Sequence, residues 1–271
     1  MAIELVAPVK INLTLHVTGQ RDDGYHLLDS LVVFAPLGDR LWVEPACRMA
    51  LEVTGPFAAG VPEDGRNLVW RAADLAGQTL RIRLEKNLPH GAGIGGGSSD
   101  AAALLRAFDA LERAIELGAD VPVCLSSRPQ RMEGMGERLS RATGVPALSL
   151  VLVNPGVPLP TPAVFTALTA KTNPGMERLG GWSHRAGFVE WLKAQRNDLE
   201  PPARALAPVI GDVLAALAAA GCDLARMSGS GATCFGVFAS EAAAAEAAER
   251  LSRAHPGWWT RSCETIPSAD I

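Results

Sequence analysis

The chain has 271 residues, of which 48% are hydrophobic and 20% are charged, and its formal net charge is −4. These values exclude an intrinsically disordered protein, and the length suits two domains that each bury a core. A net negative charge gives no field that would attract a phosphate backbone, so a nucleic-acid partner is not expected. Five scattered cysteines, without a C-x-x-C pair or a metal-ligand cluster, are expected to be reduced core thiols.

The N-terminus and the most apolar helical stretch indicate a soluble, cytoplasmic protein without a membrane partner. Glu4 stands where a signal peptide needs positive charge followed by an apolar run. The apolar run at Val213–Gly221 is well short of the roughly 18 residues that a membrane span needs.

The first predicted element is a strand whose apolar residues alternate from Ile11 to Val17. Lys10 and Asn12 fall on its other face, so we expect a half-buried strand that presents these two side chains together. Further strands are predicted at 31–34, 41–44, 49–53 and 80–84, and helices at 67–75 and 100–116.

A buried-strand pattern at 147–153 follows a Gly-Val-Pro turn and leads into a proline-rich loop. We therefore place a domain boundary here, with an N-terminal domain at 1–147 and a C-terminal domain at 148–271. In the C-terminal domain, the sequence predicts helices at 162–170, 186–194, 202–220 and 241–254, and strands at 226–238 and 258–265. The pattern as a whole indicates an α+β fold.

A glycine-rich run between Pro89 and Ser99 leads directly into a predicted helix. Such a loop suits an anion, because glycines let the backbone approach closely and the helix N-terminus carries partial positive charge. Ser98, Ser99 and Asp100 are candidate caps of this helix. The run satisfies G-x-G-x-x-G only formally, since no Rossmann pattern follows, and a Walker A loop is excluded because Gly97 occupies the lysine position. A flexible turn without function is the alternative.

Lys10, Asp120 and a later glycine cluster are ambiguous when each is taken alone. Asp120 lies just before Pro122 and is more often a turn or capping aspartate, and Lys10 is more often a solvated surface lysine. The glycine cluster at Ala225–Phe235 can be a hairpin turn, or it can be a second loop that closes on one nucleotide together with the first.

Taken together and in order, the motifs of this sequence resemble those of the GHMP kinases. Within that superfamily they are similar to the branch that acts on 4-diphosphocytidyl-2-C-methyl-D-erythritol. The matching segments are Ala7–Leu15, Asp23–His26, Gly95–Ala101, Gly118–Pro122, Glu133–Glu137, Asn197–Glu200 and Met227–Thr233. The segment between Asp100 and Asp120 is shorter than is usual in this branch.

The resemblance implies a two-domain GHMP kinase fold, with an N-terminal domain like domain 2 of ribosomal protein S5 and a ferredoxin-like C-terminal domain. It implies ATP-dependent phosphorylation of the 2-hydroxyl of the cytidine-linked polyol, with Mg²⁺, in the non-mevalonate pathway of isoprenoid precursor synthesis. Its small-molecule partners would be ATP and that polyol, and the chain would be a monomer or a homodimer. No metal ligands are assigned.

The resemblance also implies roles for individual residues. Asp120 would be the general base, and Lys10 would orient it and stabilise charge. The residues implied at the nucleotide are Asn67, Pro89, His90, Gly91, Ala92, Gly93, Ile94, Gly95, Gly96, Gly97, Ser98 and Ser99. Those implied at the polyol substrate are Asn12, Tyr25, His26, Asp120, Thr161 and Phe165.

Two alternatives stay open at this point. Another GHMP kinase, acting on homoserine or mevalonate, would share most motifs, although Asp23–His26 argues against it. A nucleotide sensor of the same fold without turnover would be expected to lose the Lys10/Asp120 pair, and both residues are present.

Overall fold

The computed structural model describes residues 2–182 and 184–268. These residues form two compact units whose segments interleave along the chain. Unit 1 contains the residues up to Lys10, Leu37–His90 and Gly95–Ser127, and unit 2 contains Ile11–Pro36, Gly91–Ile94 and the residues from Arg128 onward. The predicted boundary between residues 147 and 148 cuts the sequence at a single point, whereas each unit is made of three separate segments. That boundary stays a prediction.

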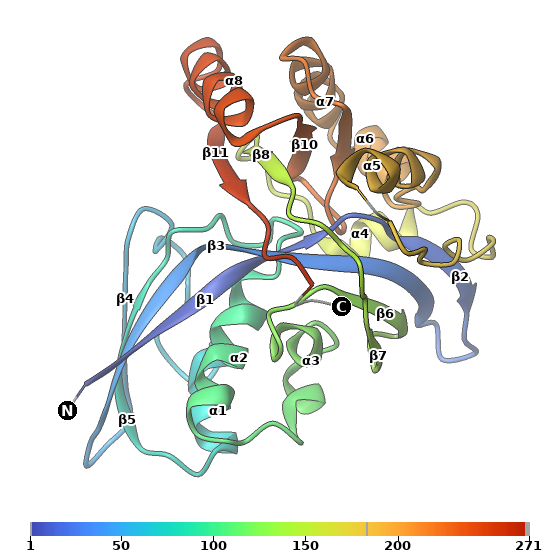
Figure 1. The fold of residues 1–271 in the computed structure, drawn as a ribbon. Helices are drawn as coiled ribbons and strands as arrows, with labels where there is room; N and C mark the ends of the chain where they lie inside the picture. Colours follow the sequence, from blue (N-terminus) through green and yellow to red (C-terminus); the bar gives the residue numbers. More distant parts are fainter. Residues whose placement is uncertain (1, 183, 269–271) are drawn as a thin grey trace. The chain divides into compact units, whose positions relative to one another are not determined.

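Unit 1 combines strands with four helical elements. Strand β5 pairs antiparallel with the C-terminal part of β3 and parallel with β4. Buried Leu80, Ile82 and Leu84 alternate along β5 with exposed arginines, as expected of a sheet with one solvated face. Helices α1 and α2 pack against each other (Figure 1). The elements are β1 (Ile3–Asn12), β3 (His26–Pro45), β4 (Ala50–Thr54), β5 (Leu80–Glu85), α1 (Leu68–Leu75), α2 (Gly96–Ala107), the 3₁₀ helix η1 (Ala114–Leu117) and α3 (Val121–Cys124); β1 and β3 continue into unit 2.

The predicted helix at 100–116 is displaced in the structure. Helix α2 already begins at Gly96, after Gly95 in a left-handed conformation with φ of 64°, and it ends at Ala107. Asp109 has a positive φ of 52°, which a continuing α-helix does not allow, and within the rest of the predicted range the only helical element described is η1. The expected caps were wrong, because Gly95 is the N-cap residue and no side chain caps α2.

Unit 2 is built around a four-stranded antiparallel sheet in the order β11-β8-β10-β9. Helices α7 and α8 pack on this sheet (Figure 1), and side chains such as Val151, Ile210 and Leu251 form the core. This layer agrees with the expected ferredoxin-like arrangement. The strands are β8 (Ser149–Asn154), β9 (Leu224–Met227), β10 (Cys234–Phe238) and β11 (Trp259–Glu264), and the helices are α7 (Val209–Ala219) and α8 (Glu241–Ala254).

The remaining elements of unit 2 are β2 (His16–Gln20), β6 (Gln130–Gly134), β7 (Arg138–Arg141), α4 (Thr161–Thr166), α5 (Arg185–Ala194) and α6 (Glu200–Leu206). The helix predicted at 202–220 is divided into α6 and α7, because Pro208 lacks the N–H that a continuous helix needs. Among the described residues no single helix is long and apolar enough to cross a membrane, and α6 and α7 reach that length only as a pair bent by 118°.

The strand predicted between Ile11 and Val17 differs from the structure in extent and burial. β1 ends at Asn12 and β2 begins at His16. The apolar residues are buried as expected, but Lys10 and Asn12 are only 3% and 1% exposed, so the prediction of a half-buried strand was wrong. The cysteines are free, with Cys47 exposed rather than in the core.

Candidate active site

The Lys10 ammonium and the Asp120 carboxylate form an ion pair in unit 1, with 2.8 Å between Nζ and Oδ2. Lys10 lies on β1, and Asp120 immediately precedes α3. The Asp120 side chain makes no capping hydrogen bond to α3, so the ordinary capping role is not the one it performs here. The Lys10 side chain is 3% exposed and that of Asp120 is 42% exposed. A carboxylate in this position is held by a buried cation and still open to a ligand.

The first turn of α2 lies against Lys10. A Cβ atom built on Gly95 would stand 3.1 Å from Lys10 Cβ and 3.2 Å from Lys10 Cε, so the glycine backbone runs directly beside the lysine stem. The first N–H groups of a helix have no partner within it, and they point along the axis toward any anion placed there. The ion pair therefore lies next to a helix N-terminus that can hold phosphate.

Ser99 is already fully engaged within unit 1. Its hydroxyl donates to the Pro8 carbonyl at 2.7 Å, and its N–H donates to the Gly95 carbonyl at 2.8 Å. Ser99 thus fixes α2 on β1. Although Ser99 is expected at the nucleotide, its hydroxyl and its backbone N–H both already donate to carbonyl oxygens of the protein.

In unit 2, the short segment Gly91–Ile94 meets the later glycine cluster. Ser228 Oγ donates to the Gly93 carbonyl at 3.0 Å, and Thr233 N–H donates to the Ala92 carbonyl at 3.1 Å. A side chain on Gly93 would collide with the backbone of Gly231. The two glycine-rich stretches of the sequence therefore come together at Gly93.

His26 and Phe165 form a stacked pair in unit 2, with 4.9 Å between ring centroids and 28° between ring planes. The Nε2 atom of His26 is buried without a hydrogen-bond partner. Burial, and secondarily the charge of Lys171, lower the pKa of His26, which favours the neutral imidazole. The pair offers an apolar face together with a hydrogen-bonding edge. Tyr25 is 64% exposed beside it in sequence.

Asn12 and Thr161 also lie in unit 2. The side-chain Nδ2 of Asn12 donates to Ser30 Oγ at 2.8 Å, and the backbone N–H of Asn12 donates to Ser228 Oγ at 3.0 Å. The side-chain Oδ1 of Asn12 is buried without a hydrogen-bond partner. Thr161 Oγ1 lies 2.7 Å from Ser230 Oγ at the start of α4, the helix that also carries Phe165. Buried polar atoms are nearly always paired, so the free oxygen of Asn12 is suited to a ligand.

Two residues expected at the nucleotide have structural partners in unit 1. Asn67 is the N-cap of α1, where its Oδ1 accepts from Val69 N–H at 2.9 Å and its Nδ2 donates to the Pro62 carbonyl at 2.8 Å. His90 Nε2 lies 3.2 Å from the Ala59 carbonyl oxygen. Asn67 thus uses its amide to start α1, and a nucleotide role for it stays a prediction.

Asn197 is a residue to which sequence reasoning gave no role, although its motif was noticed. Its Nδ2 donates to the carbonyls of Met227 and Gly229 at 2.8 and 2.9 Å, so it holds the entry to the second glycine cluster. Only the tertiary contact reveals this, because 30 residues separate Asn197 from Met227.

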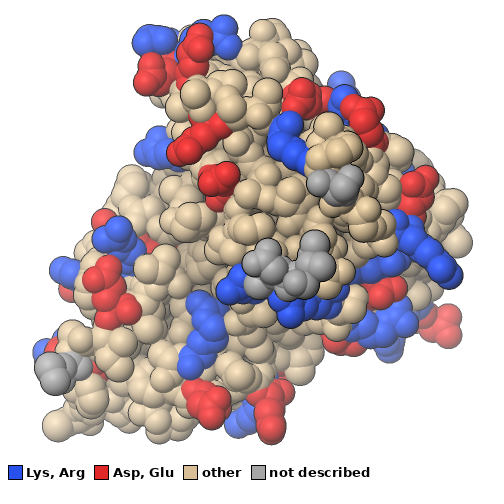
Figure 2. Space-filling model, in the orientation of Figure 1, with Lys and Arg blue, Asp and Glu red and all other residues tan. Residues whose placement is uncertain are grey.

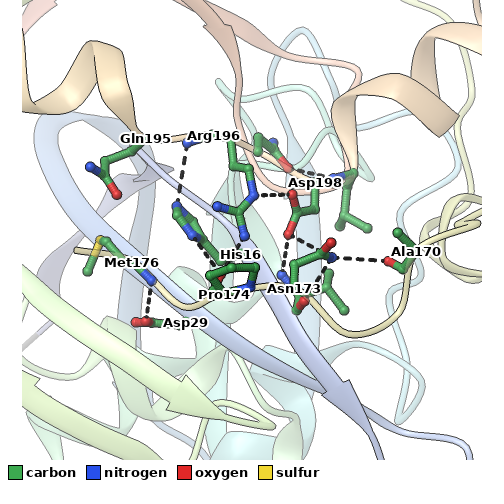
Figure 3. Close-up of polar contacts among 12 residues, drawn as sticks. His16, Asp29, Ala170, Asn173, Pro174, Met176, Gln195, Arg196 and Asp198 are labelled. Atoms are coloured by element: carbon green, nitrogen blue, oxygen red, sulfur yellow. Dashed lines mark hydrogen bonds and ion pairs between the residues drawn. The ribbon is translucent and has the colours of Figure 1, made fainter.

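A polar network fixes the irregular segment that follows α4 in unit 2 (Figure 3). The Asp198 carboxylate accepts from the Val17 N–H at 2.7 Å and from Arg196 Nε at 2.6 Å, and Asn173 N–H donates to the Val17 carbonyl at 3.1 Å. Asp29 accepts from the Met176 N–H at 2.7 Å, as Figure 3 shows. The segment from Asn173 to Met176 is therefore anchored at several points.

Charge is mixed on the surface. Over the face drawn in Figure 2, basic and acidic side chains are interspersed among uncharged ones, in keeping with the small net charge of −4. Specific recognition of a charged ligand must then come from local groups such as the α2 N-terminus, since a long-range field is weak.

Comparison with known proteins places the chain in a family. The model of the GHMP kinases N-terminal domain matches residues 67–127, and that of the GHMP kinases C-terminal domain matches residues 183–257. The 4-diphosphocytidyl-2-C-methyl-D-erythritol kinase of Dinoroseobacter shibae is 58% identical over 93% of this chain and 91% of its own length. The enzyme of the same name from Paracoccus denitrificans is 57% identical over 97% and 96%.

Solved structures agree with these relatives. A crystal structure of 4-(cytidine 5'-diphospho)-2C-methyl-D-erythritol kinase has a TM-score of 0.78 and 37% identity, and the match covers 97% of this chain and 99% of that one. The homoserine kinase of Cytophaga hutchinsonii, with a TM-score of 0.69 and 18% identity over 99% and 96%, shares the fold. The chain belongs to the 4-diphosphocytidyl-2-C-methyl-D-erythritol kinase family within the GHMP kinases.

Proposed function

We propose that this chain transfers the γ-phosphate of ATP to the 2-hydroxyl of 4-diphosphocytidyl-2-C-methyl-D-erythritol, with Asp120 and Lys10 as its catalytic pair. The observation that carries the proposal is the 2.8 Å ion pair of these residues beside Gly95, where α2 begins. Phosphoryl transfer needs a held phosphate, neutralised charge and an acceptor for the hydroxyl proton, and unit 1 contains groups for each task.

Asp120 takes the proton of the attacking hydroxyl. The hydroxyl oxygen then bonds to the γ-phosphorus, the bond to the β-phosphate oxygen breaks, and ADP leaves. Lys10 orients the carboxylate, and its buried ammonium stabilises negative charge during transfer. The 42% exposure of Asp120 leaves room for the substrate hydroxyl to approach.

The glycine-rich loop, Pro89 to Ser99, is the proposed site of the triphosphate. The N-terminal N–H groups of α2 would hold phosphate oxygens. Ser99 acts from beneath, by fixing α2 to Pro8. Asn67 would border the adenine while it caps α1.

The cytidine-linked polyol is the proposed second substrate, and the groups of unit 2 suit its base. The face of Phe165 can stack on cytosine, and the unpaired Nε2 of His26 can hydrogen-bond to the base. Tyr25 is exposed and available as a second stacking surface. Asn12 and Thr161 complete the proposed set.

Magnesium is proposed to arrive with ATP. Among the residues that the structure describes, no group of three or more His, Cys, Asp or Glu side chains is arranged to hold a metal ion. This fits Mg²⁺, which commonly takes one or two protein oxygens and completes its shell with phosphates and waters. When bound, the ion would neutralise phosphate charge, and Asp120 offers an exposed carboxylate paired with Lys10, whose stem runs beside Gly95. A cytoplasmic location and a monomeric or homodimeric state stay predictions.

An ADP-release assay tests the proposal. The purified protein is given ATP, Mg²⁺ and, in separate reactions, the cytidine-linked polyol, free methylerythritol, homoserine or mevalonate. The expected result is turnover with the first acceptor at a kcat/KM at least about 100-fold above the others, since a site built around a base loses that binding energy without it. Activity on homoserine or mevalonate alone would refute the proposed substrate.

A further inference from the structure

Three further charged side chains, none of them part of the Lys10/Asp120 pair, are buried together in unit 1. The ammonium of Lys86 lies between the carboxylates of Asp39 and Asp100, with 2.7 Å from Nζ to Asp100 Oδ2 and a direct contact to Asp39 Oδ2. The three side chains are at most 3% exposed. Moving such charges out of water costs free energy, and this cost is offset only by close pairing and by additional hydrogen bonds.

The cluster connects the two ends of the glycine-rich loop. At the entry, Asp39 Oδ1 accepts from the N–H groups of Asn87 and Leu88 at 2.6 and 2.9 Å, where the chain leaves β5. At the exit, Asp100 belongs to the second turn of α2, and Lys86 binds it. One ammonium therefore ties both the residues before the loop and the helix after it.

The backbone of Lys86 is fixed as well. Its N–H donates to the Thr54 carbonyl at 2.8 Å, and its carbonyl accepts from Phe57 N–H at 3.1 Å. The ammonium reaches the underside of the first helical turn, since a Cβ built on Gly96 would stand 3.5 Å from Nζ. The Lys86 backbone is thus hydrogen-bonded on both sides, and its ammonium lies beside the turn proposed to hold phosphate.

The charge balance of the cluster matters for an anion nearby. One ammonium and two carboxylates leave one negative charge beneath the α2 N-terminus, which would repel a triphosphate. Burial raises the pKa of Asp100, with Lys86 opposing and Asp39 adding to the rise. Protonation of Asp100, which burial favours, would remove this negative charge from beneath the helix N-terminus.

We propose that Lys86, bridging Asp39 and Asp100, is a positioning residue that sets the geometry of the glycine-rich loop for the ATP phosphates. It touches no reacting atom and acts through Asn87, Leu88 and the first turn of α2. The inference rests on the proposed use of ATP. Its expected signature is selective, because loss of loop geometry should weaken ATP and leave the cytidine-linked polyol unaffected.

The test compares Lys86→Met with Lys86→Arg in the full chain. Each variant is checked for folding by circular dichroism, titrated with ATP by calorimetry, and assayed for KM with both substrates. Lys86→Met should raise the Kd and KM for ATP about 10- to 100-fold, the range in which displacement of positioning groups acts, with KM for the polyol within about twofold. Lys86→Arg, which keeps a cation between the carboxylates, should recover ATP affinity to within about threefold.

Lys86→Met leaves two buried carboxylates facing each other, so Lys86→Met/Asp100→Asn is the companion variant that removes one of them. The same selective loss of ATP affinity is expected of it. Arg131→Met is the matched control, because it removes a cation from a partly buried ion pair with Asp29 in unit 2 (2.7 Å). This control should lower the melting temperature and leave ATP affinity unchanged.

The outcomes separate cleanly. A folded Lys86→Met or double variant with ATP affinity within twofold of the wild type would overturn the proposal. Equal loss of ATP affinity in Arg131→Met would also overturn it, since general destabilisation would then explain the effect. If the wild-type chain itself binds no ATP, the proposed function fails instead.

Discussion

Replacement of Asp120 by Asn separates catalysis from stability because the two partners of the Lys10/Asp120 pair are buried so differently. The amide keeps an oxygen that can accept from Nζ, but it leaves the ammonium of Lys10, whose side chain is 3% exposed, without a countercharge. Breaking a fully buried pair costs about 3–5 kcal/mol, and an exposed pair contributes about 0–1 kcal/mol. With one partner buried and the other 42% exposed, we expect the substitution to lower the free energy of unfolding by about 1–2 kcal/mol. For a chain of this length that corresponds to a fall of about 2–8 °C in Tm.

The catalytic effect of Asp120→Asn should be much larger than the effect on stability. Loss of a general base lowers kcat by about 10²- to 10⁴-fold, and ATP affinity by calorimetry should change little. Asp223→Asn is the matched control, because Asp223 is 37% exposed and pairs with Arg185 at 3.0 Å in unit 2. It should keep full kcat. Turnover of Asp120→Asn within threefold of the wild type would refute the role of Asp120 as base.

Three further outcomes follow from other residues. Gly95→Ala should weaken ATP binding about 10-fold, because the φ of Gly95 is +64° and the new Cβ would press on Lys10. Gly77→Ala is the control, since Gly77 has the same φ with open space around it, and this variant should lower only Tm. Equal ATP binding by the two variants would contradict the prediction. Phe165→Ala should raise KM for the cytidine-linked polyol about 5- to 150-fold with ATP KM unchanged, because base stacking is worth about 1–3 kcal/mol. Burial, and next the charge of Arg196, lower the pKa of His16 from 6.5, so the unfolded chain binds the proton more readily; Tm should fall as pH drops from 7 toward 5, and His16→Gln should flatten that dependence.

Much of the fold could be predicted because its elements are locally encoded. Helix α8 begins and ends at the predicted residues, Glu241 and Ala254, since Ser240 caps it and a long alanine-rich pattern precedes His255. Strand β5 follows from its strict alternation. The strands β6 and β7 were missed, because their short polar sequences carry little period-two signal and are stabilised by pairing with β3 and with each other.

The site was predicted less completely, for a physical reason. Lys10 and Asp120 came from a family motif, and their ion pair is visible only once 110 residues of chain have folded back. The burial of Lys10 and Asn12 contradicted the prediction of a half-buried strand. Alternating apolar residues indicate that one face of a strand is packed, but they cannot show whether other residues cover the opposite face. The Lys86 cluster joins β3, the end of β5 and α2, which no local pattern reveals.

The interleaving of the two units along the chain has a consequence for the order in which they fold during synthesis. All segments of unit 1 lie before residue 128, so this unit can be complete while the rest of the chain is still being made. Unit 2 must wait, because buried Arg226 donates to the carbonyls of Leu13, Leu192 and Gln195, which closes a loop of more than 200 residues. Contacts of such long range are slow to form. Residues of 11–36 whose partners lie late in the chain, such as Leu13, are therefore expected to wait for those partners until translation has passed Arg226, and this is where a chaperone would be needed.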